Sequence, residues 1–198
     1  METSPLTTHI AIDHPLIPGL HLTEARWSDR ATLVRLINDA PEISQNTVAI
    51  PYPYSDQDAE FALREVFWKQ DQATGQVRNF VIRGQDDVLM GVISLFHRSE
   101  NDPRDSAELG YWLGSPYWGK SVMTTVVRCV LQVAFGDYGL RSVSSGCFLG
   151  NNKSRRVLEK SGFQLLDGQR TYTKLNGQVV QSHRFELKNP AMAQQAME

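Results

Sequence analysis

Residues 108–135 read ELGYWLGSPYWGKSVMTTVVRCVLQVAF, which predicts a strand, a glycine-containing turn and a helix in direct succession. The helix is predicted from two adjacent rows of apolar residues at i, i+4 spacing, which are Val122, Val126 and Val130 in one row and Met123, Val127, Leu131 and Phe135 in the other. Together the rows form an apolar stripe wide enough to pack a helix on a sheet. Backbone N–H groups at such a turn, directed by a helix N-terminus, form a binding site for phosphate.

The segments on both sides of this stretch predict a mixed sheet covered by helices on both faces. Helices are expected to begin at Ser28-Asp29 and at Ser55-Asp56, with a loop over residues 41–54 between them. A short helix is expected over Asn151–Ser161, closed by Gly162. Further strands are expected at residues 20–25, 79–83, 88–97, 141–148, 163–172 and 179–187.

This order of elements predicts the α/β (α+β) fold class in one domain. The domain is expected over residues 20–188, preceded by an N-terminal extension over 1–19 and followed by a flexible C-terminal tail over 189–198. The chain has 198 residues, of which 41% are hydrophobic and 21% charged, which is enough for a well-formed core.

The composition also limits where the protein acts and what it binds. No apolar run approaches the roughly 20 residues of a membrane helix, and the N-terminus has no export signal. We therefore expect a cytoplasmic protein that does not bind membranes. Cys129 and Cys147 lie in apolar surroundings without the spacing of metal ligands, so neither a metal site nor a disulfide framework is expected.

Positive charge is concentrated between Gly119 and Lys160. That segment contains seven basic and two acidic residues, a net charge of +5, so the remainder of the chain carries −7. The total of −2 argues against a nucleic-acid-binding protein. A locally basic segment in an acidic chain suits a small polyanionic ligand, and the alternative is an ordinary solvated surface.

One alternative is a nucleotide-binding P-loop, because Gly114–Ser121 satisfies the pattern G-x-x-x-x-G-K-S. Three observations argue against it. Pro116 has no N–H to donate to a phosphate, and two bulky aromatic residues follow it. The strand over 141–148 does not end in an aspartate that would hold magnesium. Only 77 residues follow Ser121, which is few for the crossovers of a parallel sheet.

Three motifs occur in one order along the chain. They are AELGYWL at 107–113, YWGK at 117–120, and Asn151-x-x-Ser154 in a segment that ends in Gly162-Phe163. In this combination the sequence resembles the GNAT acetyltransferases, and within them the RimJ/RimL-like branch of ribosomal-protein N-terminal acetyltransferases, from Leu20 to Leu187. The resemblance implies the GNAT fold, with a mixed, mostly antiparallel central sheet of six to seven strands flanked by four helices.

The resemblance also implies how acetyl-CoA binds. In the family, the strand of the first motif separates from its neighbour and pairs with the pantetheine arm, which here would contact Leu109, Gly110, Tyr111, Trp112 and Leu113. The following loop holds the pyrophosphate, here at Trp118, Gly119, Lys120, Ser121, Val122 and Met123. Asn151 would bond to the cofactor arm, and the ribose phosphate would meet Lys153, Arg155 and Arg156. The chain departs from the family loop at Pro116 and Ser121.

Acetyl transfer needs a neutral amine, a polarised thioester carbonyl and a proton or hydrogen bond for the leaving thiolate. Glu108 is the first candidate for the base and His97 is the alternative; the structural alternatives are an exposed carboxylate and a solvent-facing histidine. Ser154 is the candidate for the group beside the thiolate, unless its hydroxyl bonds only to the start of the helix. Since no base motif accompanies either cysteine, we expect direct transfer without an acyl-enzyme.

The acceptor groove is expected to involve Tyr52, Tyr54 and His97, whereas Phe61 and Phe67 are expected in the core. The sequence therefore predicts an acetyl-CoA-dependent N-acetyltransferase whose acceptor is the α-amine of a protein or peptide. The open alternatives are acetylation of a small-molecule amine (polyamine, amino acid or antibiotic) and a catalytically silent acyl-CoA-binding sensor. The expected partners are acetyl-CoA, with CoA as product, and the amine, and the expected assembly is a monomer or homodimer without nucleic acid.

Overall fold

The fold is built on one sheet of eight strands in the order β1-β2-β3-β4-β5-β6-β8-β7. The computed structural model describes residues 9–68, 79–96 and 105–195. Neighbouring strands are antiparallel except β5 and β6, which are parallel. The strands are β1 (His9–Ala11), β2 (His21–Thr23), β3 (Asn79–Arg83), β4 (Leu89–Phe96), β5 (Ser106–Leu113), β6 (Ser142–Phe148), β7 (Gln164–Thr173) and β8 (Val179–Lys188).

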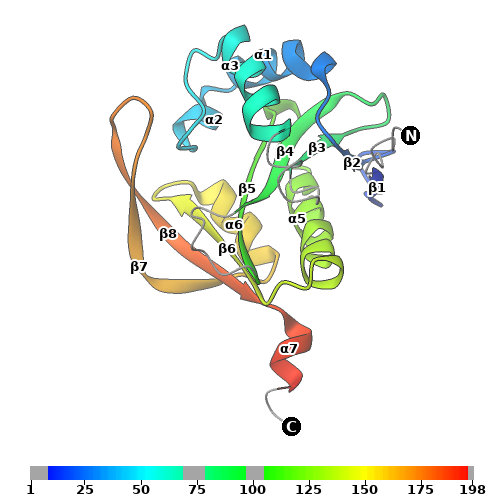
Figure 1. Ribbon diagram of the computed structural model, residues 1–198, viewed down its shortest axis with the longest axis vertical. Helices are drawn as coiled ribbons and strands as arrows, with labels where there is room; N and C mark the ends of the chain where they lie inside the picture. The colour runs from blue at the N-terminus through cyan, green and yellow to red at the C-terminus, as the bar shows by residue number, and fades with distance from the viewer. Residues whose placement is uncertain (1–8, 69–78, 97–104, 196–198) are drawn as a thin grey trace, which may run out of the picture.

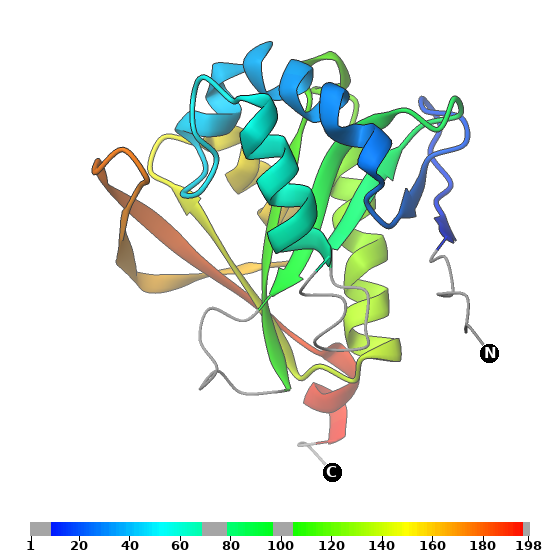
Figure 2. The same ribbon diagram turned by 45° about the horizontal axis from the view of Figure 1, so that its top comes forward.

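Two groups of helices cover the two faces of the sheet (Figures 1 and 2). One face carries α1 (Arg30–Asn38), α2 (Pro41–Gln45) and α3 (Asp56–Phe61), the last continued by the π-helical segment η2 (Ala62–Trp68). The other face carries α5 (Val122–Gln132), continued by η4 (Val133–Asp137), and α6 (Asn152–Lys160). Helix α7 (Pro190–Gln195) follows β8, and two 3-10 turns, η1 (Trp27–Asp29) and η3 (Ser115–Tyr117), precede α1 and α5.

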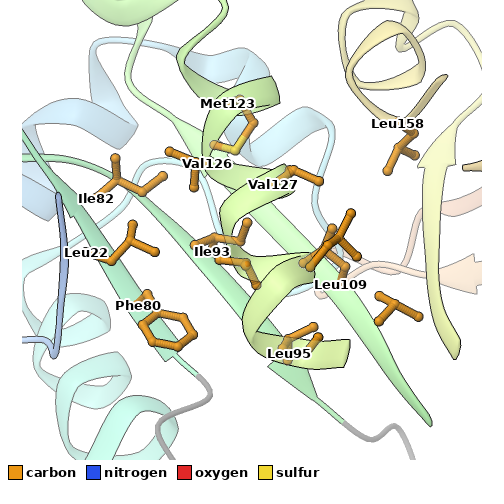
Figure 3. Packing of buried hydrophobic residues seen from close by; sticks show 14 of the residues in the cluster. Leu22, Phe80, Ile82, Ile93, Leu95, Leu109, Met123, Val126, Val127 and Leu158 are labelled. Atoms are coloured by element: carbon orange, nitrogen blue, oxygen red, sulfur yellow. The ribbon is translucent and has the colours of Figure 1, made fainter. Parts of the chain in front are cut away.

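The apolar stripe predicted for residues 122–135 is the main contact between helix and sheet. Figure 3 shows Val126 and Val127 of α5 among the side chains of the strands, and both are fully buried. A second apolar cluster lies on the opposite face, where Leu33 and Ile37 of α1 pack with Val92 of β4. Burial on both faces explains why β3 and β4 consist almost entirely of buried residues.

Local signals in the sequence fix several turns and helix ends. The Ser55 hydroxyl accepts the N–H of Asp58 at 3.1 Å and caps α3, as predicted. Gly162 ends α6 with φ +94°, a left-handed conformation that favours glycine. Gly114 has a steric role, because a Cβ there would lie 2.9 Å from Leu36 Cδ2 and 3.2 Å from the Met90 carbonyl oxygen. The first glycine of the P-loop pattern is therefore explained by packing between strand and helix.

A buried ion pair fastens α1 to the sheet. The Arg83 guanidinium donates two hydrogen bonds of 2.8 Å to the two carboxylate oxygens of Asp29, and its Nε donates to Thr23 Oγ1 at 2.7 Å. The side chains of Arg83 and Asp29 are only 2% and 6% exposed. Asp29 was predicted to cap the following helix, but its side chain makes no capping bond there. Instead it accepts the N–H of Arg26 and pairs with β3.

The predicted fold class is confirmed, with a mixed and mostly antiparallel sheet. The described residues form eight strands, not six to seven, because His9–Ala11 pairs with β2. Residues 41–45 form a helix and not the predicted loop, and Pro41 in its first turn suits proline's fixed φ. Residues 190–195 of the predicted flexible tail form α7. Within the described ranges, no helix is long and apolar enough to cross a membrane.

Candidate active site

The parallel strands β5 and β6 separate part-way along their length. Their ladder runs from the Ser106–Ser142 pair to the Leu109–Ser145 pair, whereas β5 continues to Leu113 and β6 to Phe148. Over that last part β5 remains paired with β4, and Figure 1 shows β5 and β6 spreading apart. An extended strand edge of this kind can bind a ligand through its backbone N–H and C=O groups.

A cavity of about 1300 Å³ extends through this gap. Its wall includes β5, β6, α5 and α6 on one side and α1, α2 and α3 on the other. Pockets for a single small ligand commonly measure about 300–1000 Å³. The volume is therefore sufficient for two reactants that meet in the gap.

The loop between β5 and α5 opens toward the cavity. Gly119 and Ser121 adopt left-handed conformations with φ +75° and +61°, and the Ser121 side chain does not cap α5. The first-turn residues Val122 and Met123 line the cavity together with both loop residues. Uncapped N–H groups at a helix N-terminus attract anions, so this end of the cavity suits phosphate groups.

Helix α6 forms the adjoining wall and positions Ser154. Asn151 caps the helix by accepting the Ser154 N–H on its side-chain oxygen at 3.1 Å. Ser154 Oγ lies 2.9 Å from the hydroxyl of Tyr111 on β5, so a hydrogen bond spans the gap. The Lys153 ammonium lies 3.9 Å from the centre of the Trp118 ring, a cation–π contact between helix and loop.

Burial controls the protonation of two groups in the cavity wall. Desolvation raises the pKa of Tyr111 far above its usual value, so its phenol remains protonated at neutral pH. Desolvation likewise raises the pKa of the Cys147 thiol to about 11. The thiolate is the nucleophilic form of cysteine, so Cys147 is poorly suited to carry an acyl group at neutral pH.

Glu108 lies on β5 opposite Ser144 of β6, just before the point where the two strands separate. Its side chain is 9% exposed, lines the cavity and forms an ion pair with Arg170 of β7 at 3.3 Å. The structural alternative for Glu108, an exposed strand carboxylate, is therefore excluded. The fold thus holds a carboxylate in the cavity wall.

The residues predicted for the acceptor groove differ in position. Tyr54 is buried and lines the cavity, and its hydroxyl donates to the Asp58 carbonyl, while burial raises its pKa to about 12. Tyr52 is exposed and does not line the cavity. His97 lies outside the described residues. Phe61, predicted to be in the core, is 62% exposed at the cavity wall, whereas Phe67 is buried.

Most residues predicted to bind the cofactor do meet around this one cavity. The wall includes Leu109, Gly110, Tyr111, Trp112, Leu113, Trp118, Gly119, Ser121, Val122, Met123, Asn151, Lys153 and Arg156. Lys120 does not line it, because its ammonium turns back to the Pro116 carbonyl at 3.0 Å. Arg155 pairs with Glu159 and is also absent from the wall.

Comparison with known proteins identifies the family. The family model described as "Acetyltransferase (GNAT) domain" matches residues 20–164. The chain belongs to the GNAT acetyltransferase family. The resemblance inferred from the three sequence motifs is thereby confirmed.

Individual relatives of this GNAT chain match part of its length. It is 35% identical over 111 residues to "Probable N-acetyltransferase YjcK" of Bacillus subtilis (strain 168), covering 56% of this chain and 60% of that protein. It is 31% identical over 94 residues to "Ribosomal-protein-serine acetyltransferase" of Escherichia coli (strain K12), covering 48% of this chain and 50% of that protein. The matches thus span between half and three fifths of these two relatives.

Solved structures share the whole fold. "Mycobacterium smegmatis RimJ in complex with CoA-disulfide" superposes with a TM-score of 0.74, covering 94% of this chain and 88% of that one at 17% identity. At that identity the likeness shows the fold alone.

Two basic residues that do not line the cavity make long-range contacts beside it without any signal in the sequence. Arg170 contacts Glu108 as described. Lys174, at the end of β7, donates to the carbonyl oxygens of Ser44 at 2.7 Å and Gln45 at 2.9 Å, at the C-terminal end of α2. Both contacts join segments far apart in the chain, so only the topology reveals them.

Proposed function

We propose that the chain is an acetyl-CoA-dependent N-acetyltransferase that moves the acetyl group directly to the α-amine of a peptide or protein. The observation that carries this proposal is one cavity in which Glu108 and the Ser154–Tyr111 pair face the same gap. Membership of the GNAT family supports acetyl transfer. A relative named as a ribosomal-protein-serine acetyltransferase supports a protein acceptor.

The cavity fits the cofactor that the family implies. The strand edge at Gly110–Leu113 offers extended backbone for an amide-containing arm, and the first turn of α5 offers N–H groups for phosphates. Lys153, Arg156 and Lys160 add three cations along α6. Acetyl-CoA, when bound, supplies the acetyl group as an activated thioester.

Acetyl-CoA is expected to stabilise the fold. At 100 times its dissociation constant, a ligand raises the free energy of unfolding by about 2.7 kcal/mol. For a chain of this size that corresponds to a rise in Tm of about 5–11 °C. Thermal unfolding with and without acetyl-CoA measures it, and an unchanged Tm at saturating acetyl-CoA contradicts the cofactor assignment.

Adjacent arginines provide a matched control for this measurement. Arg156 lines the cavity, so Arg156→Gln should reduce the rise in Tm at a fixed acetyl-CoA concentration. Arg155 instead pairs with Glu159, so Arg155→Gln should leave the rise unchanged. If both substitutions change the acetyl-CoA-induced rise in Tm equally, the cofactor phosphates do not bind at Arg156.

The chain's own residues supply the remaining chemistry. The Glu108 carboxylate accepts a proton from the amine, directly or through water, while Arg170 holds one of its oxygens. The Ser154 hydroxyl donates a hydrogen bond to the leaving thiolate sulfur. The raised pKa of the Cys147 thiol argues against an acyl-enzyme at that residue and supports direct transfer.

The α-amine acceptor follows from the cost of deprotonation. An α-amino group has a pKa of about 7.7–8.0, so roughly a tenth is neutral at pH 7. A lysine amine, with a pKa of about 10.4, requires about 3.5 kcal/mol more to lose its proton. The candidate base is one carboxylate, Glu108, which is already paired with Arg170. Such a base suits the α-amine, because the α-amine costs less free energy to deprotonate than a lysine amine.

Two matched peptides test the acceptor, one with a free N-terminus and a blocked lysine and the other reversed. We expect kcat/KM at pH 7 to be at least about tenfold higher for the free N-terminus, since its neutral fraction is about 300-fold larger. The ratio of the two kcat/KM values should fall between pH 7 and pH 9, because the neutral fraction of the lysine amine rises more steeply with pH than that of the α-amine. A preference for the lysine peptide at pH 7 overturns the proposal, and turnover of neither favours a small-molecule amine.

A further inference from the structure

The cavity has two chemically different ends. Its three lining cations, Lys153, Arg156 and Lys160, all belong to α6. The three carboxylates in its described wall are Glu42 of α2, Asp58 of α3 and Glu108 of β5. Opposite charges at the two ends suit two different ligands, a polyanion along α6 and a cationic amine under α2 and α3.

The end under α2 and α3 is also apolar. Phe61 of α3, Val66 of the following π-helical segment and Leu175 of the β7–β8 turn line it, although they are 62%, 38% and 69% exposed. Single exposed apolar side chains are ordinary, but a group drawn from two distant segments, residues 61–66 and the β7–β8 turn, around one cavity marks a binding surface. Ile43 and Ile50 extend the apolar wall between them.

This wall is held in place. The Leu175 N–H donates to the Val48 carbonyl at 3.4 Å, beside the two bonds of Lys174 to the end of α2. The β7–β8 turn and residues 44–48 are thereby joined across the cavity. Leu175 is consequently a fixed part of the wall and not the tip of a free hairpin.

We infer that this end selects the acceptor by an apolar or aromatic group next to its amine. The inference rests on the proposed function: for a peptide acceptor, the first residue would be Phe, Leu or a side chain of similar size. The amine lies at Glu108 and the apolar group fills the space lined by Phe61, Val66 and Leu175. Glu108 is paired with Arg170, so Glu42 and Asp58 are the acidic groups at this end that disfavour a carboxylate-bearing first residue.

The test uses four peptides with blocked lysines that differ only in the first residue: Phe, Leu, Ser and Asp. We expect kcat/KM for the Phe and Leu peptides to exceed that for Ser by about tenfold or more, as for pockets that discriminate apolar groups. Asp should be the poorest. CoA release at pH 7 measures each rate, and a parallel series compares phenethylamine with ethanolamine.

Two variants test whether the preference for an apolar first residue comes from the wall at Phe61. Phe61→Ala should lower the ratio of kcat/KM between the Phe and Ser peptides by about fivefold or more, because it removes part of the apolar wall. Leu16→Ala is the control, since Leu16 is 63% exposed, like Phe61, but does not line the cavity. It should leave the ratio unchanged. Thermal unfolding of both variants verifies that they fold.

The outcomes separate this inference from the proposed function. Equal turnover of all four peptides overturns the inference and leaves α-amine acetylation standing. If phenethylamine is acetylated faster than ethanolamine and none of the peptides is acetylated, the result supports the inference and overturns the peptide acceptor. Octanoyl-CoA reacting faster than acetyl-CoA would assign the apolar wall to the acyl chain, and turnover of neither series would contradict both proposals.

Discussion

Ser154→Ala is expected to lower kcat by about tenfold to a thousandfold, the effect of losing one hydrogen-bond donor directed at a developing charge. The Tyr111 hydroxyl lies 2.9 Å from Ser154 Oγ and 3.3 Å from the Ser154 carbonyl oxygen. With the tyrosine proton directed at Oγ, the shorter of the two contacts, the serine proton is left for the thiolate. Because Ser154 carries no charge, the Kd of acetyl-CoA should change less than about twofold. Steady-state kinetics and a binding titration measure the two effects separately.

Ser144→Ala is the matched control for this prediction. Ser144 is a partly buried serine of β6 whose hydroxyl makes a long bond of 3.5 Å to the Ala107 carbonyl and which does not line the cavity. Its substitution should leave kcat near the wild-type value. Wild-type kcat in Ser154→Ala would instead confine the Ser154 hydroxyl to its hydrogen bond with Tyr111.

Features that depend on a few neighbouring residues were predictable from the sequence. The two apolar rows of α5, the Ser55 cap and the glycine end of α6 are all local patterns, and the structure confirms each of them. The motif order also predicted which segments surround the cofactor cavity, since the turn after β5 and the start of α6 both open into it. In each case the physical cause lies within one or two helical turns.

Features that depend on distant partners were not predictable. The three residues of β1 become a strand because β2 lies beside them. Asp29 has the local signature of a helix cap, yet its carboxylate binds Arg83, 54 residues away. Arg170 and Lys174 reach partners 62 and 130 residues away. No local pattern encodes such contacts, because the residues next to an arginine or lysine in the sequence do not show which distant carboxylate or carbonyl it will meet in the fold.

In the candidate site, too, local sequence predicted which segments take part but not where each side chain lies. Lys120 belongs to the matching motif, but the loop turns its ammonium back to Pro116, so the motif alone misplaced the side chain relative to the cavity. Tyr52 and Tyr54 are two residues apart and looked equivalent in the sequence. In the fold, the Tyr54 backbone is held by Asn38 of α1 and its ring is buried, whereas Tyr52 is exposed.

Asp29→Ala is expected to reduce the free energy of unfolding by about 3–5 kcal/mol, because it removes the carboxylate that accepts two hydrogen bonds from the buried Arg83 guanidinium. The remaining carboxylate partner, Asp87, is half-exposed and lies farther away, at 3.6 Å. For a chain of this length the loss corresponds to a fall in Tm of about 6–20 °C. The pair fastens the start of α1 to β3, and Leu33 and Ile37 of α1 line the cavity. Urea and thermal unfolding measure the change.

Two further variants show whether the buried charge is the cause. Asp39 pairs with Arg35 on the exposed surface of α1 at 3.6 Å, so Asp39→Ala should cost less than about 1 kcal/mol. The double substitution Asp29→Leu with Arg83→Met removes both charges, and it should cost less than Asp29→Ala alone because no buried guanidinium is left without its close partner. If Asp29→Ala proves no more destabilising than Asp39→Ala, the ion pair does not fasten α1. A double variant worse than the single one would instead assign the stability to the hydrogen bonds of Arg83 with Thr23 and the neighbouring backbone.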